Sequence, residues 1–380
     1  MNFDLSEEQI AIRDAARNFA ESEIAPSAIE RDIAGKFPTE IIKKLGELGF
    51  MGMMVSPKWG GAGMDTLSYV LAIEEISKVD ASVGVIMSVN NSLVCYGIEK
   101  WGSDYLKEKY LKPLAKGEML GAFCLSEPEA GSDATKQKTE AILQGDHYIL
   151  NGMKNWITNG TTADLYLLQA MTDKSKGHKG ISTFLVEKKW DGIEIGKKED
   201  KLGIRSSDTC SIGFNNVKVP KENLLGKEGI GFKIAMGTLD GGRIGVAAQA
   251  LGIAQASFEA SVKYSKERKA FDATISNLQA IQFKLADMAT NIEAARLLIY
   301  RAAINKDEDK SYSKESSMGK LLASQAAVNS ALEAIQIHGG YGYVREYLVE
   351  RFLRDSKITQ IYEGTSEIQK IVIARALLKD

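Results

Sequence analysis

The spacing of apolar and turn residues changes twice along the chain, and this division limits the possible folds more than any other feature. Residues 1 to about 120 show helical spacing of apolar residues, as at Ile41 and Leu45. Residues 121–228 hold short β-type runs between turn residues, and helical spacing returns in residues 229–380. This order predicts an α+β protein with three domains: 1–120 helical, 121–228 β and 229–380 helical.

Two turn signals stand out in the middle region. Gly145-Asp146 and Asn151-Gly152 lie on either side of Tyr148-Ile149-Leu150, and both dipeptides are typical of hairpin turns. We therefore expect a short strand between two turns. Further strands are expected, such as the alternating segment from Cys210 to Val219.

The C-terminal region carries a long apolar seam. Its members step by four and three residues: Ile281, Leu285, Met288, Ile292, Ala295 and Ile299. Such spacing predicts one long helix packed against others. A second apolar helix is expected over about 315–337.

Composition and charge exclude several classes of protein. The formal net charge is −2, so the overall charge would not draw this chain to nucleic acid or to an anionic membrane. The three cysteines lie far apart, which is not a disulfide framework and fits a reducing compartment. With three histidines and no Cys-x-x-Cys or His-Glu-x-x-His motif, we expect no metal site.

The hydropathy pattern and the N-terminus bear on location. We see no apolar run that approaches the ~20 residues of a membrane span, so we expect no membrane insertion. The first nine residues are acidic and contain neither a signal-peptide core nor an Arg-rich transit segment. We expect a cytoplasmic protein of a bacterium, although a trimmed protein of the mitochondrial matrix would look similar.

One acidic residue near the C-terminus has an unusual setting. Glu363 lies between Tyr362 and Gly364, follows an apolar stretch and precedes a helix that Thr365 or Ser366 can cap. A carboxylate on such an apolar turn has a raised pKa and can act as a base near neutral pH. An ordinary turn glutamate is the alternative, and spacing alone does not exclude it.

The sequence Tyr-Glu-Gly-Thr at 362–365 resembles the catalytic segment of the acyl-CoA dehydrogenase family, whose glutamate removes the α-proton of a fatty acyl thioester. Further segments resemble that family in the same order, and together they span nearly the whole chain. The resemblance implies an N-terminal helical domain, a middle β-barrel or sandwich domain and a C-terminal four-helix bundle. It also implies a homotetramer that binds FAD between the β domain and the C-terminal helices.

The loop from Phe123 to Asp133 contains Pro, Gly and two serines, so its backbone N–H groups and hydroxyls can hold a ligand; a plain turn is the alternative. The loop resembles the family's flavin loop, which implies that Leu125 and Ser126 hold the pyrimidine edge of the flavin. Ser132 would face both the cofactor pyrophosphate and the thioester. Glu129 replaces a residue that is commonly small, and its charge would be unfavourable near phosphates if it pointed inward.

The segment from Lys154 to Gly160 places Trp156 beside Thr158, and such a pair on a strand is usually part of a core. An aromatic face and one hydroxyl also suit a planar redox ring. In the family this segment lies along the isoalloxazine. The resemblance therefore implies that Trp156 stacks near the flavin and that Thr158 hydrogen-bonds its N5 edge.

A helix is expected to begin near Leu239, and its small residues can simply allow close helix packing. In the family this region receives coenzyme A, which implies that Asp240 and Arg243 lie near that channel. Some relatives carry the catalytic glutamate one residue before this arginine. Here that residue is Gly242, so Glu363 is the one evident base.

Two more segments match parts of the family that reach the FAD of a neighbouring subunit. Arg268 resembles the arginine that contacts the pyrophosphate, a task that suits a guanidinium through bidentate contacts. Asp272 and Thr274 replace a common glycine and proline, so the shape of this loop is expected to differ. The segment from Gln336 to Gly340 resembles the glycine-rich part that approaches the same pyrophosphate; a helix C-cap is the alternative.

The resemblance thus implies a full set of site residues, with Glu363 as the catalytic base. The expected cofactor contacts are Phe123, Leu125, Ser126, Ser132, Trp156, Ile157, Thr158, Arg268, Phe271, Gln279, Gln336, Ile337, Gly339, Gly340, Thr365 and Glu367. The expected substrate contacts are Ser132, Asp240, Gly241, Gly242, Arg243 and Gly364.

The predicted reaction is the FAD-dependent α,β-dehydrogenation of a short-chain acyl-CoA, of the butyryl-CoA type, to the trans-2-enoyl-CoA. Glu363 takes the α-proton, the β-hydride passes to flavin N5, and electron-transfer flavoprotein receives the electrons. Three alternatives remain: an oxidase of the same fold, a dehydrogenase for cyclic or branched acyl-CoA, and a non-catalytic helical scaffold. The polar pair Asn90-Asn91, if it approaches the acyl pocket, favours the second alternative.

Overall fold

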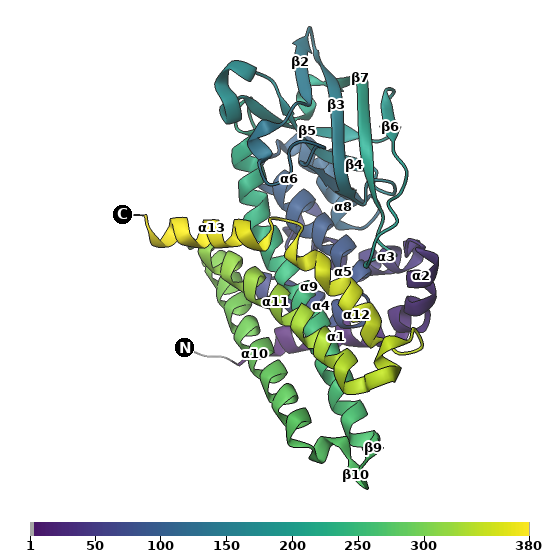
Figure 1. The fold of residues 1–380 in the computed structure, drawn as a ribbon. Helices are drawn as coiled ribbons and strands as arrows, with labels where there is room; N and C mark the ends of the chain where they lie inside the picture. Colours follow the sequence, from purple (N-terminus) through teal and green to yellow (C-terminus); the bar gives the residue numbers. More distant parts are fainter. Residues whose placement is uncertain (1–3, 380) are drawn as a thin grey trace.

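The structure, a computed structural model, describes residues 4–379 and has the three-part architecture that the sequence predicts. The middle β region lies at one end of the molecule, and the N-terminal and C-terminal helices pack together below it (Figure 1). The α+β fold class is therefore confirmed. The first three residues, which contributed to the prediction of location, lie outside the described residues.

The N-terminal region consists of helices joined by short 3-10 and π-helical turns: α1 (Glu7–Phe19), α2 (Ala28–Ala34), α3 (Thr39–Glu47), α4 (Thr66–Val79), α5 (Ala81–Ser88), α6 (Tyr96–Trp101), α7 (Asp104–Leu106) and α8 (Lys112–Ala115). The continuous stretch Ala81–Trp101 is long and apolar enough to cross a membrane, which the sequence-based expectation overlooked. Because 94% of its apolar window is buried inside the protein, it is the core helix of this region.

Asn90 and Asn91 lie in the π-helical segment Val89–Cys95 of this core helix. The amide of Asn90 donates to the carbonyl of Met51 at 2.8 Å, and its oxygen accepts from the N–H of Gly121 at 3.0 Å. The Asn91 oxygen accepts from the N–H of Met53 at 2.8 Å. Both side chains therefore satisfy buried backbone groups, and neither supports the idea of a polar acyl pocket.

The middle region is an eight-stranded sheet in the order β6-β7-β3-β2-β4-β5-β8, with β1 parallel to β4. Its strands are β1 (Gly121–Cys124), β2 (Glu140–Gln144), β3 (His147–Thr158), β4 (Leu165–Met171), β5 (Ile181–Glu187), β6 (Ile193–Ile195), β7 (Thr209–Pro220) and β8 (Leu224–Leu225). Strands β2 and β4 are joined by one residue pair, Glu140 and Met171. Tyr148 of β3 packs on Phe184 of β5 with ring centroids 4.8 Å apart, so the two halves of the sheet share a core as in a sandwich.

The two turn signals of this region have different outcomes. Gly145-Asp146 forms the expected hairpin between β2 and β3, and Gly145 has φ 63°. The prediction of a second turn at Asn151-Gly152 is wrong, because both residues lie inside β3 where the pairing with β7 shifts register. Gly152 has φ 147°, and a Cβ there would lie 2.5 Å from the Thr139 hydroxyl oxygen. This glycine therefore allows a bulge and a close approach rather than a turn.

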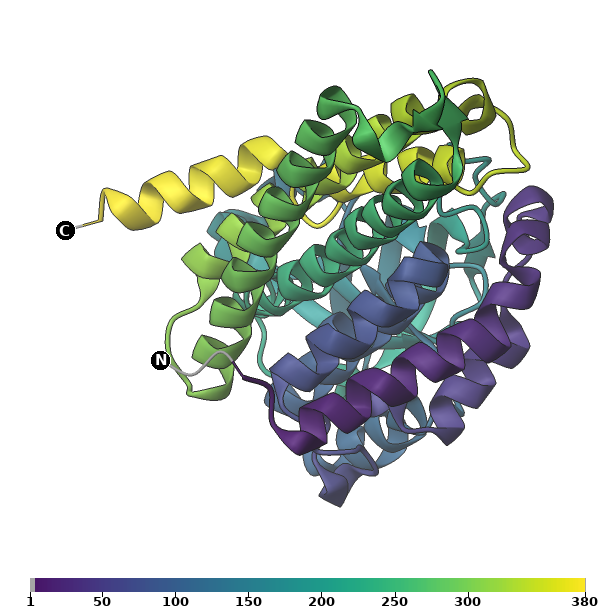
Figure 2. The same cartoon turned by 90° about the horizontal axis from the view of Figure 1, so that it is seen from below.

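The C-terminal region contains long helices and one small hairpin: α9 (Gly231–Glu267), β9 (Lys269–Ala270), β10 (Ala273–Thr274), α10 (Gln279–Asp307), α11 (Ser313–His338), α12 (Val349–Ser356) and α13 (Ser366–Leu377). The predicted seam is confirmed, since Met288, Ile292, Ala295 and Ile299 are buried on α10. Seen from below, α9, α10 and α11 lie side by side, and α13 projects away from the rest of the molecule (Figure 2).

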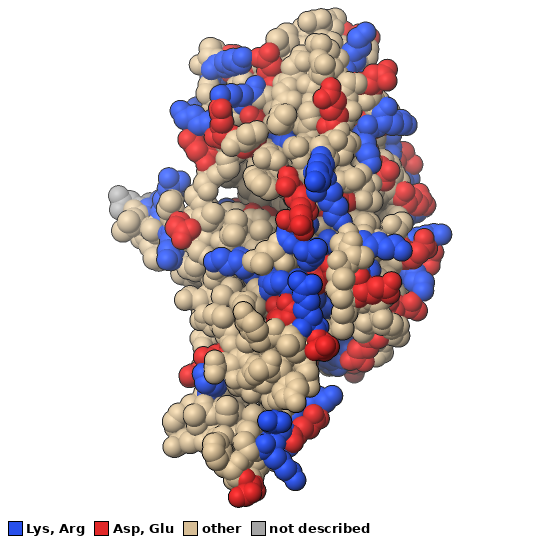
Figure 3. Space-filling view, turned by 45° about the vertical axis from the view of Figure 1, so that its right-hand side comes forward, with Lys and Arg blue, Asp and Glu red and all other residues tan. Residues whose placement is uncertain are grey.

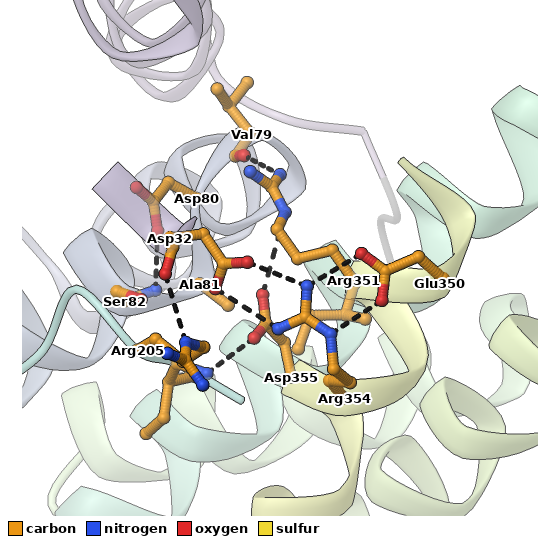
Figure 4. A network of polar contacts seen from close by, with 12 residues as sticks. Asp32, Val79, Asp80, Ala81, Ser82, Arg205, Glu350, Arg351, Arg354 and Asp355 are labelled. Carbon is orange, nitrogen blue, oxygen red and sulfur yellow. Dashed lines mark hydrogen bonds and ion pairs between the residues drawn. The ribbon is translucent and has the colours of Figure 1, made fainter. Parts of the chain in front are cut away.

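A polar network ties the three regions together (Figure 4). Arg354 of α12 pairs with Asp32 of α2 at 2.7 Å and with Glu350 of its own helix at 2.7 Å. Asp355, the next residue, accepts from the backbone N–H of Ile204 in the middle region at 2.5 Å. Burial raises the pKa of Asp355 to about 7. The network therefore fixes α12, and the turn that follows it, against both other regions.

Candidate active site

Glu363 lies on a turn immediately before α13, as the sequence predicts. It has φ 52°, and Gly364 has φ 94°, so two consecutive residues adopt left-handed backbone conformations. Thr365, rather than Ser366, caps the helix by accepting from the N–H of Ile368 at 3.4 Å. A non-glycine residue with positive φ is uncommon, and its presence beside a helix start marks a turn that the surroundings hold in place.

The Glu363 carboxylate occupies a tight space against α9. A Cβ at Gly242 would lie 2.2 Å from Glu363 Oε2 and 2.6 Å from Leu93 Cδ2, so this glycine is what admits the carboxylate. Oε2 is buried and accepts no hydrogen bond from any described residue. Burial raises the pKa of Glu363 to about 7, against the opposing charges of Lys320 and Arg243. The group is thus tuned to exchange a proton near neutral pH.

Asp240 and Arg243 form an ion pair beside this carboxylate, three residues apart on α9. Arg243 Nη1 lies 2.5 Å from Asp240 Oδ1, and the same oxygen accepts from the Ser313 hydroxyl of α11 at 2.9 Å. Arg243 is buried, and its Nε has no hydrogen-bond partner among the described residues. The structure therefore brings the predicted residues of α9 together with Glu363.

Two buried residues that sequence reasoning missed hold the turn of Glu363. Lys320 of α11 donates from Nζ to the carbonyl of Gly364 at 2.6 Å. Gln369 of α13 donates to the same carbonyl at 2.9 Å and to that of Glu363 at 3.3 Å. Both lie within helical patterns where a polar residue is ordinarily exposed, so the sequence carried no signal for them.

The predicted flavin loop is braced from behind by another residue that sequence reasoning missed. Lys154 is fully buried on β3 and donates to the carbonyl of Leu125 at 3.0 Å, to Glu127 at 2.8 Å and to Gln137 at 2.9 Å. The carbonyl of Ser126 accepts from the N–H of Asn155 at 2.9 Å. These contacts fix the backbone at Leu125 and Ser126, which is a requirement for a loop that binds through its backbone.

Ser132 is exposed in this loop, and Phe123 is half-buried on β1. Glu129 pairs with Lys138, and both side chains are largely exposed. Its charge therefore points to solvent, which answers the objection that it would oppose the phosphates of a bound cofactor. The departure from a small residue is compatible with the predicted site.

Trp156 and Thr158, near the end of β3, are suited to a planar ring. Trp156 has φ 60° and is 63% exposed, so it does not belong to the core of the sheet. The Thr158 hydroxyl has no hydrogen bond with another described residue, and Ile157 between them is buried. An exposed indole and a free hydroxyl are the groups that an isoalloxazine would use, so these residues fit FAD.

Contacts connect this strand end with the surroundings of Glu363. The Asn159 amide donates to the carbonyl of Gly121 at 3.1 Å, and Gly121 in turn donates to Asn90 of the core helix at 3.0 Å. The same helix carries Leu93, which lies against Gly242. Figure 3 shows the molecular surface hollowed between the β region and the C-terminal helix.

A second group of predicted cofactor residues lies at the opposite end of the long helices, around the β9–β10 hairpin (Figure 1). Six of them are exposed: Arg268, Phe271, Gln279, Gln336, Gly339 and Gly340. Phe271 is 89% exposed, and the Arg268 guanidinium lies 5.7 Å from the centre of the Tyr341 ring. Asp272 has φ 62°, so it takes the left-handed conformation for which glycine is common.

Two further predicted positions, and the neighbouring His338, are placed as follows. Ile337 is buried at the end of α11, and Glu367 is exposed in the first turn of α13. His338 is buried and stacks on Tyr264 with ring centroids 4.1 Å apart, so its role is in packing. One chain therefore brings together Glu363 and the α9 residues, but it holds the Arg268 group far from Trp156.

The helix–sheet–helix order, the exposed Trp156 indole and the raised pKa of Glu363, whose buried Oε2 has no hydrogen-bond partner among residues 4–379, fit the class of flavin-dependent dehydrogenases that act by proton and hydride removal. Residues 6–118, 122–217 and 229–378 match the models of the N-terminal, middle and C-terminal domains of acyl-CoA dehydrogenase. The chain belongs to the acyl-CoA dehydrogenase family, whose members use FAD. The predicted family, enzyme class and cofactor are confirmed.

Similar proteins match over all or nearly all of their length. The short-chain specific acyl-CoA dehydrogenase of Clostridium acetobutylicum is 50% identical over 379 residues, 100% of both chains. The mitochondrial short-chain specific enzyme of Mus musculus is 53% identical over 376 residues, 99% of this chain and 91% of that protein. Among solved structures, butyryl-CoA dehydrogenase of Megasphaera elsdenii is 50% identical with a TM-score of 0.98 and covers 100% of both chains. A chain solved in a study of the electron transferring flavoprotein of Acidaminococcus fermentans is 54% identical with a TM-score of 0.99, again over 100% of both.

Proposed function

We propose that this protein removes hydrogen from Cα and Cβ of a short-chain acyl-CoA to give the trans-2-enoyl-CoA, with Glu363 as the general base. One observation carries the assignment: the Glu363 carboxyl has a pKa near 7, and its buried Oε2 has no hydrogen-bond partner in the described part of the chain. Such a group is costly to fold and has no structural partner to justify it, which is the signature of a functional acid or base.

The α-proton of a thioester is too weakly acidic for a free carboxylate, so the site must stabilise the enolate that develops. The backbone N–H of Glu363 is the protein donor we assign to the thioester carbonyl. Gly364, Asp240, Gly241, Gly242 and Arg243 line the approach of the substrate in this proposal. Substrate binding removes water from the site and strengthens Glu363 as a base.

The cofactor residues divide between two chains in this proposal. One set would hold the flavin from the chain that also carries the base. It consists of Phe123, Leu125, Ser126, Ser132, Trp156, Ile157, Thr158, Thr365 and Glu367. When bound, FAD supplies the acceptor for the hydride that leaves Cβ. Trp156 would orient the ring, and the Thr158 hydroxyl would donate a hydrogen bond to it.

The direct test is anaerobic titration of the purified, flavin-loaded protein with butyryl-CoA, longer linear acyl-CoAs and cyclic or branched acyl-CoAs. We expect butyryl-CoA to bleach the flavin absorbance fastest. A preference for a cyclic or branched thioester would replace the short-chain assignment. A colourless protein, or a flavin that no acyl-CoA reduces, would reject the dehydrogenase function.

A homotetramer is the assembly we propose. Its support is that the Arg268 group lies too far from Trp156 in one chain to share its flavin, which requires at least a second chain. Arg268, Phe271, Gln279, Gln336, Ile337, Gly339 and Gly340 would then hold the pyrophosphate side of the FAD of a neighbouring subunit. Replacing Arg268 by Ala is expected to weaken FAD retention by at least tenfold, because a guanidinium–phosphate contact is charge-assisted. Sedimentation of a species with the mass of one chain and full flavin content would contradict this assembly.

Electron-transfer flavoprotein is the electron acceptor that we propose. The support is the chain of 54% identity that was solved in the study of such a flavoprotein from Acidaminococcus fermentans. Reduced protein should be reoxidised faster by that flavoprotein than by oxygen, and stopped-flow mixing with each would decide between dehydrogenase and oxidase. We also propose a cytoplasmic location, which cell fractionation would test.

A further inference from the structure

Lys320 is a fully buried lysine that the proposed chemistry does not use. It lies on α11, and its Nζ is 2.6 Å from the carbonyl oxygen of Gly364, one residue after the base. Burial lowers the pKa of Lys320 to about 8, while Glu363 acts to raise it. A buried ammonium group is unfavourable unless it is paired, so this contact requires an explanation.

The carbonyl that Lys320 binds belongs to the strained part of the turn. Glu363 and Gly364 both have positive φ, and left-handed conformation at a glutamate persists only where neighbouring groups fix it. Gln369 of α13 donates to the same carbonyl at 2.9 Å. Two buried side chains from two helices therefore hold one peptide group.

Lys320 binds the backbone of the turn and not the Glu363 carboxylate, as far as the described residues show. Among the described residues, no ion pair or hydrogen bond joins Lys320 to the Glu363 side chain, and Oε2 has no partner. A direct salt bridge would lower the basicity of Glu363 and restrict its motion toward substrate. Binding through the neighbouring carbonyl provides a nearby positive charge without occupying the oxygen that must take the proton.

Other charged or titratable groups that face Glu363 come from different elements. Arg243 faces it from α9, Tyr69 from α4 and Tyr362 from the preceding residue. Arg243 is already paired with Asp240, and Tyr69 donates to the Ser88 hydroxyl at 3.0 Å. Lys320 is the one of these groups that is bound to the turn itself.

We propose that Lys320 is a positioning residue for the base, which anchors the Gly364 carbonyl and thereby aims both the carboxylate and the backbone N–H of Glu363. This inference rests on the proposed dehydrogenation. It assigns α11 a part in the reaction through the contact between Lys320 and the turn that carries the base.

The test compares three substitutions of Lys320 with a matched control in the flavin-loaded protein. Lys320→Met removes donor and charge, Lys320→Gln keeps a donor, and Lys320→Arg keeps both. Lys306→Met is the control, because burial also lowers the pKa of Lys306 to about 8 and Glu363 is not among the charges that act on it. The readouts are kcat, the acid limb of kcat/KM against pH for butyryl-CoA, and the infrared band of the protonated Glu363 carboxyl, assigned by its loss in Glu363→Gln.

We expect Lys320→Met to lower kcat by at least tenfold, since small displacements of a catalytic group cost about 10²-fold. Its acid limb and infrared titration should move to higher pH by roughly half a unit or more, because a nearby positive charge favours the carboxylate. Lys320→Gln should recover part of kcat but keep the displaced limb. Lys320→Arg and Lys306→Met should retain the limb of the unmodified protein.

The proposal would be overturned if Lys320→Met and Lys306→Met had the same kcat and the same pH midpoint for the acid limb of kcat/KM. If Lys320→Met does not fold, the comparison of Lys320→Gln with Lys320→Arg decides the same question, and identical limbs in these two would overturn it. A protein whose flavin no acyl-CoA reduces would reject the proposed function instead. The infrared titration would still measure the influence of Lys320 on Glu363 in that case, so the two failures are distinguishable.

Discussion

The Glu363 carboxylate packs directly on the backbone of Gly242, where a Cβ would lie 2.2 Å from Oε2. The two residues are 121 positions apart in the chain, on the turn before α13 and on α9. The absence of a side chain at one position is therefore what gives the base its place at the other. This contact also means that a glutamate at position 242 could not coexist with the present position of Glu363.

Gly242→Ala is predicted to displace the base. The new methyl group would overlap Glu363 Oε2 and the Leu93 side chain, so kcat should fall at least tenfold, since small displacements of a catalytic group cost about 10²-fold. Steady-state assays with butyryl-CoA and a flavin spectrum would measure activity and cofactor content. Gly213→Ala in β7 is the steric comparison, because it lies outside the proposed site, its nearest neighbour atom lies 3.4 Å away and a much smaller loss is expected.

Glu363→Gln should leave a folded, yellow protein that dehydrogenates at least a hundredfold more slowly, because a positioned general base contributes ~10²–10⁴-fold. Rapid-mixing measurement of flavin bleaching isolates this step from electron transfer. Glu222→Gln, at an exposed position of the middle region, controls for loss of a carboxylate. Unchanged bleaching in Glu363→Gln would remove Glu363 from the mechanism.

The pH dependence of activity should report the ionisation of Glu363. Its pKa is raised to about 7, and only the carboxylate accepts a proton, so kcat/KM is predicted to fall as pH decreases through about 7. A profile measured between pH 5 and 8 would show this limb. A flat profile across that range would contradict the raised pKa.

The ionisation of Glu363 should also make the folded protein less stable as pH rises, whereas it makes the enzyme more active. The folded state raises the pKa of Glu363 from an ordinary 4.5 to about 7, so its neutral form is favoured on folding. That contribution is fully present below about 4.5 and is lost as pH rises through about 7. Glu363→Gln should therefore melt at a higher temperature than the unmodified protein at pH 8, with a smaller difference at pH 5.

Arg354→Met should weaken the junction of the three regions. Its guanidinium binds Asp32 and Glu350, and its removal leaves two partly buried carboxylates without a partner. We expect the free energy of unfolding to fall by about 2 kcal/mol. Thermal melting of the purified protein would detect this loss, and Lys112→Met, which breaks an exposed pair with Glu108, should change the melting temperature much less.

Much of this protein is predictable from sequence because its signals are periodic or local. The seam from Ile281 to Ile299 forms one face of α10, and the turn at Glu363 precedes a capped helix. Both follow from spacing that the chain alone displays. The Asn151-Gly152 pair shows the limit of local signals, because the same dipeptide serves a turn or a bulge, and the close approach of Gly152 to Thr139, the residue before β2, is visible only in the structure.

Buried residues whose partners lie far away in the sequence were not predictable. Lys154 and Lys320 lie within a strand and a helix whose patterns suggest exposed lysines, yet both are fully buried against carbonyl groups from other segments. The core stretch Ala81–Trp101 was likewise missed, because scattered polar residues such as Asn90 interrupt its apolar run. In each case at least one partner is a backbone group that only the folded structure brings near.

The 37-residue helix α9 has a consequence for how such chains can vary. At ~1.5 Å per residue it is a rod of about 55 Å, with the Gly242 contact toward one end and Arg268 at the other. Adding or removing one residue between them would turn the Arg268 loop by about 100° around the rod. Length changes should therefore be tolerated in the loops of the β region and selected against within this single helix.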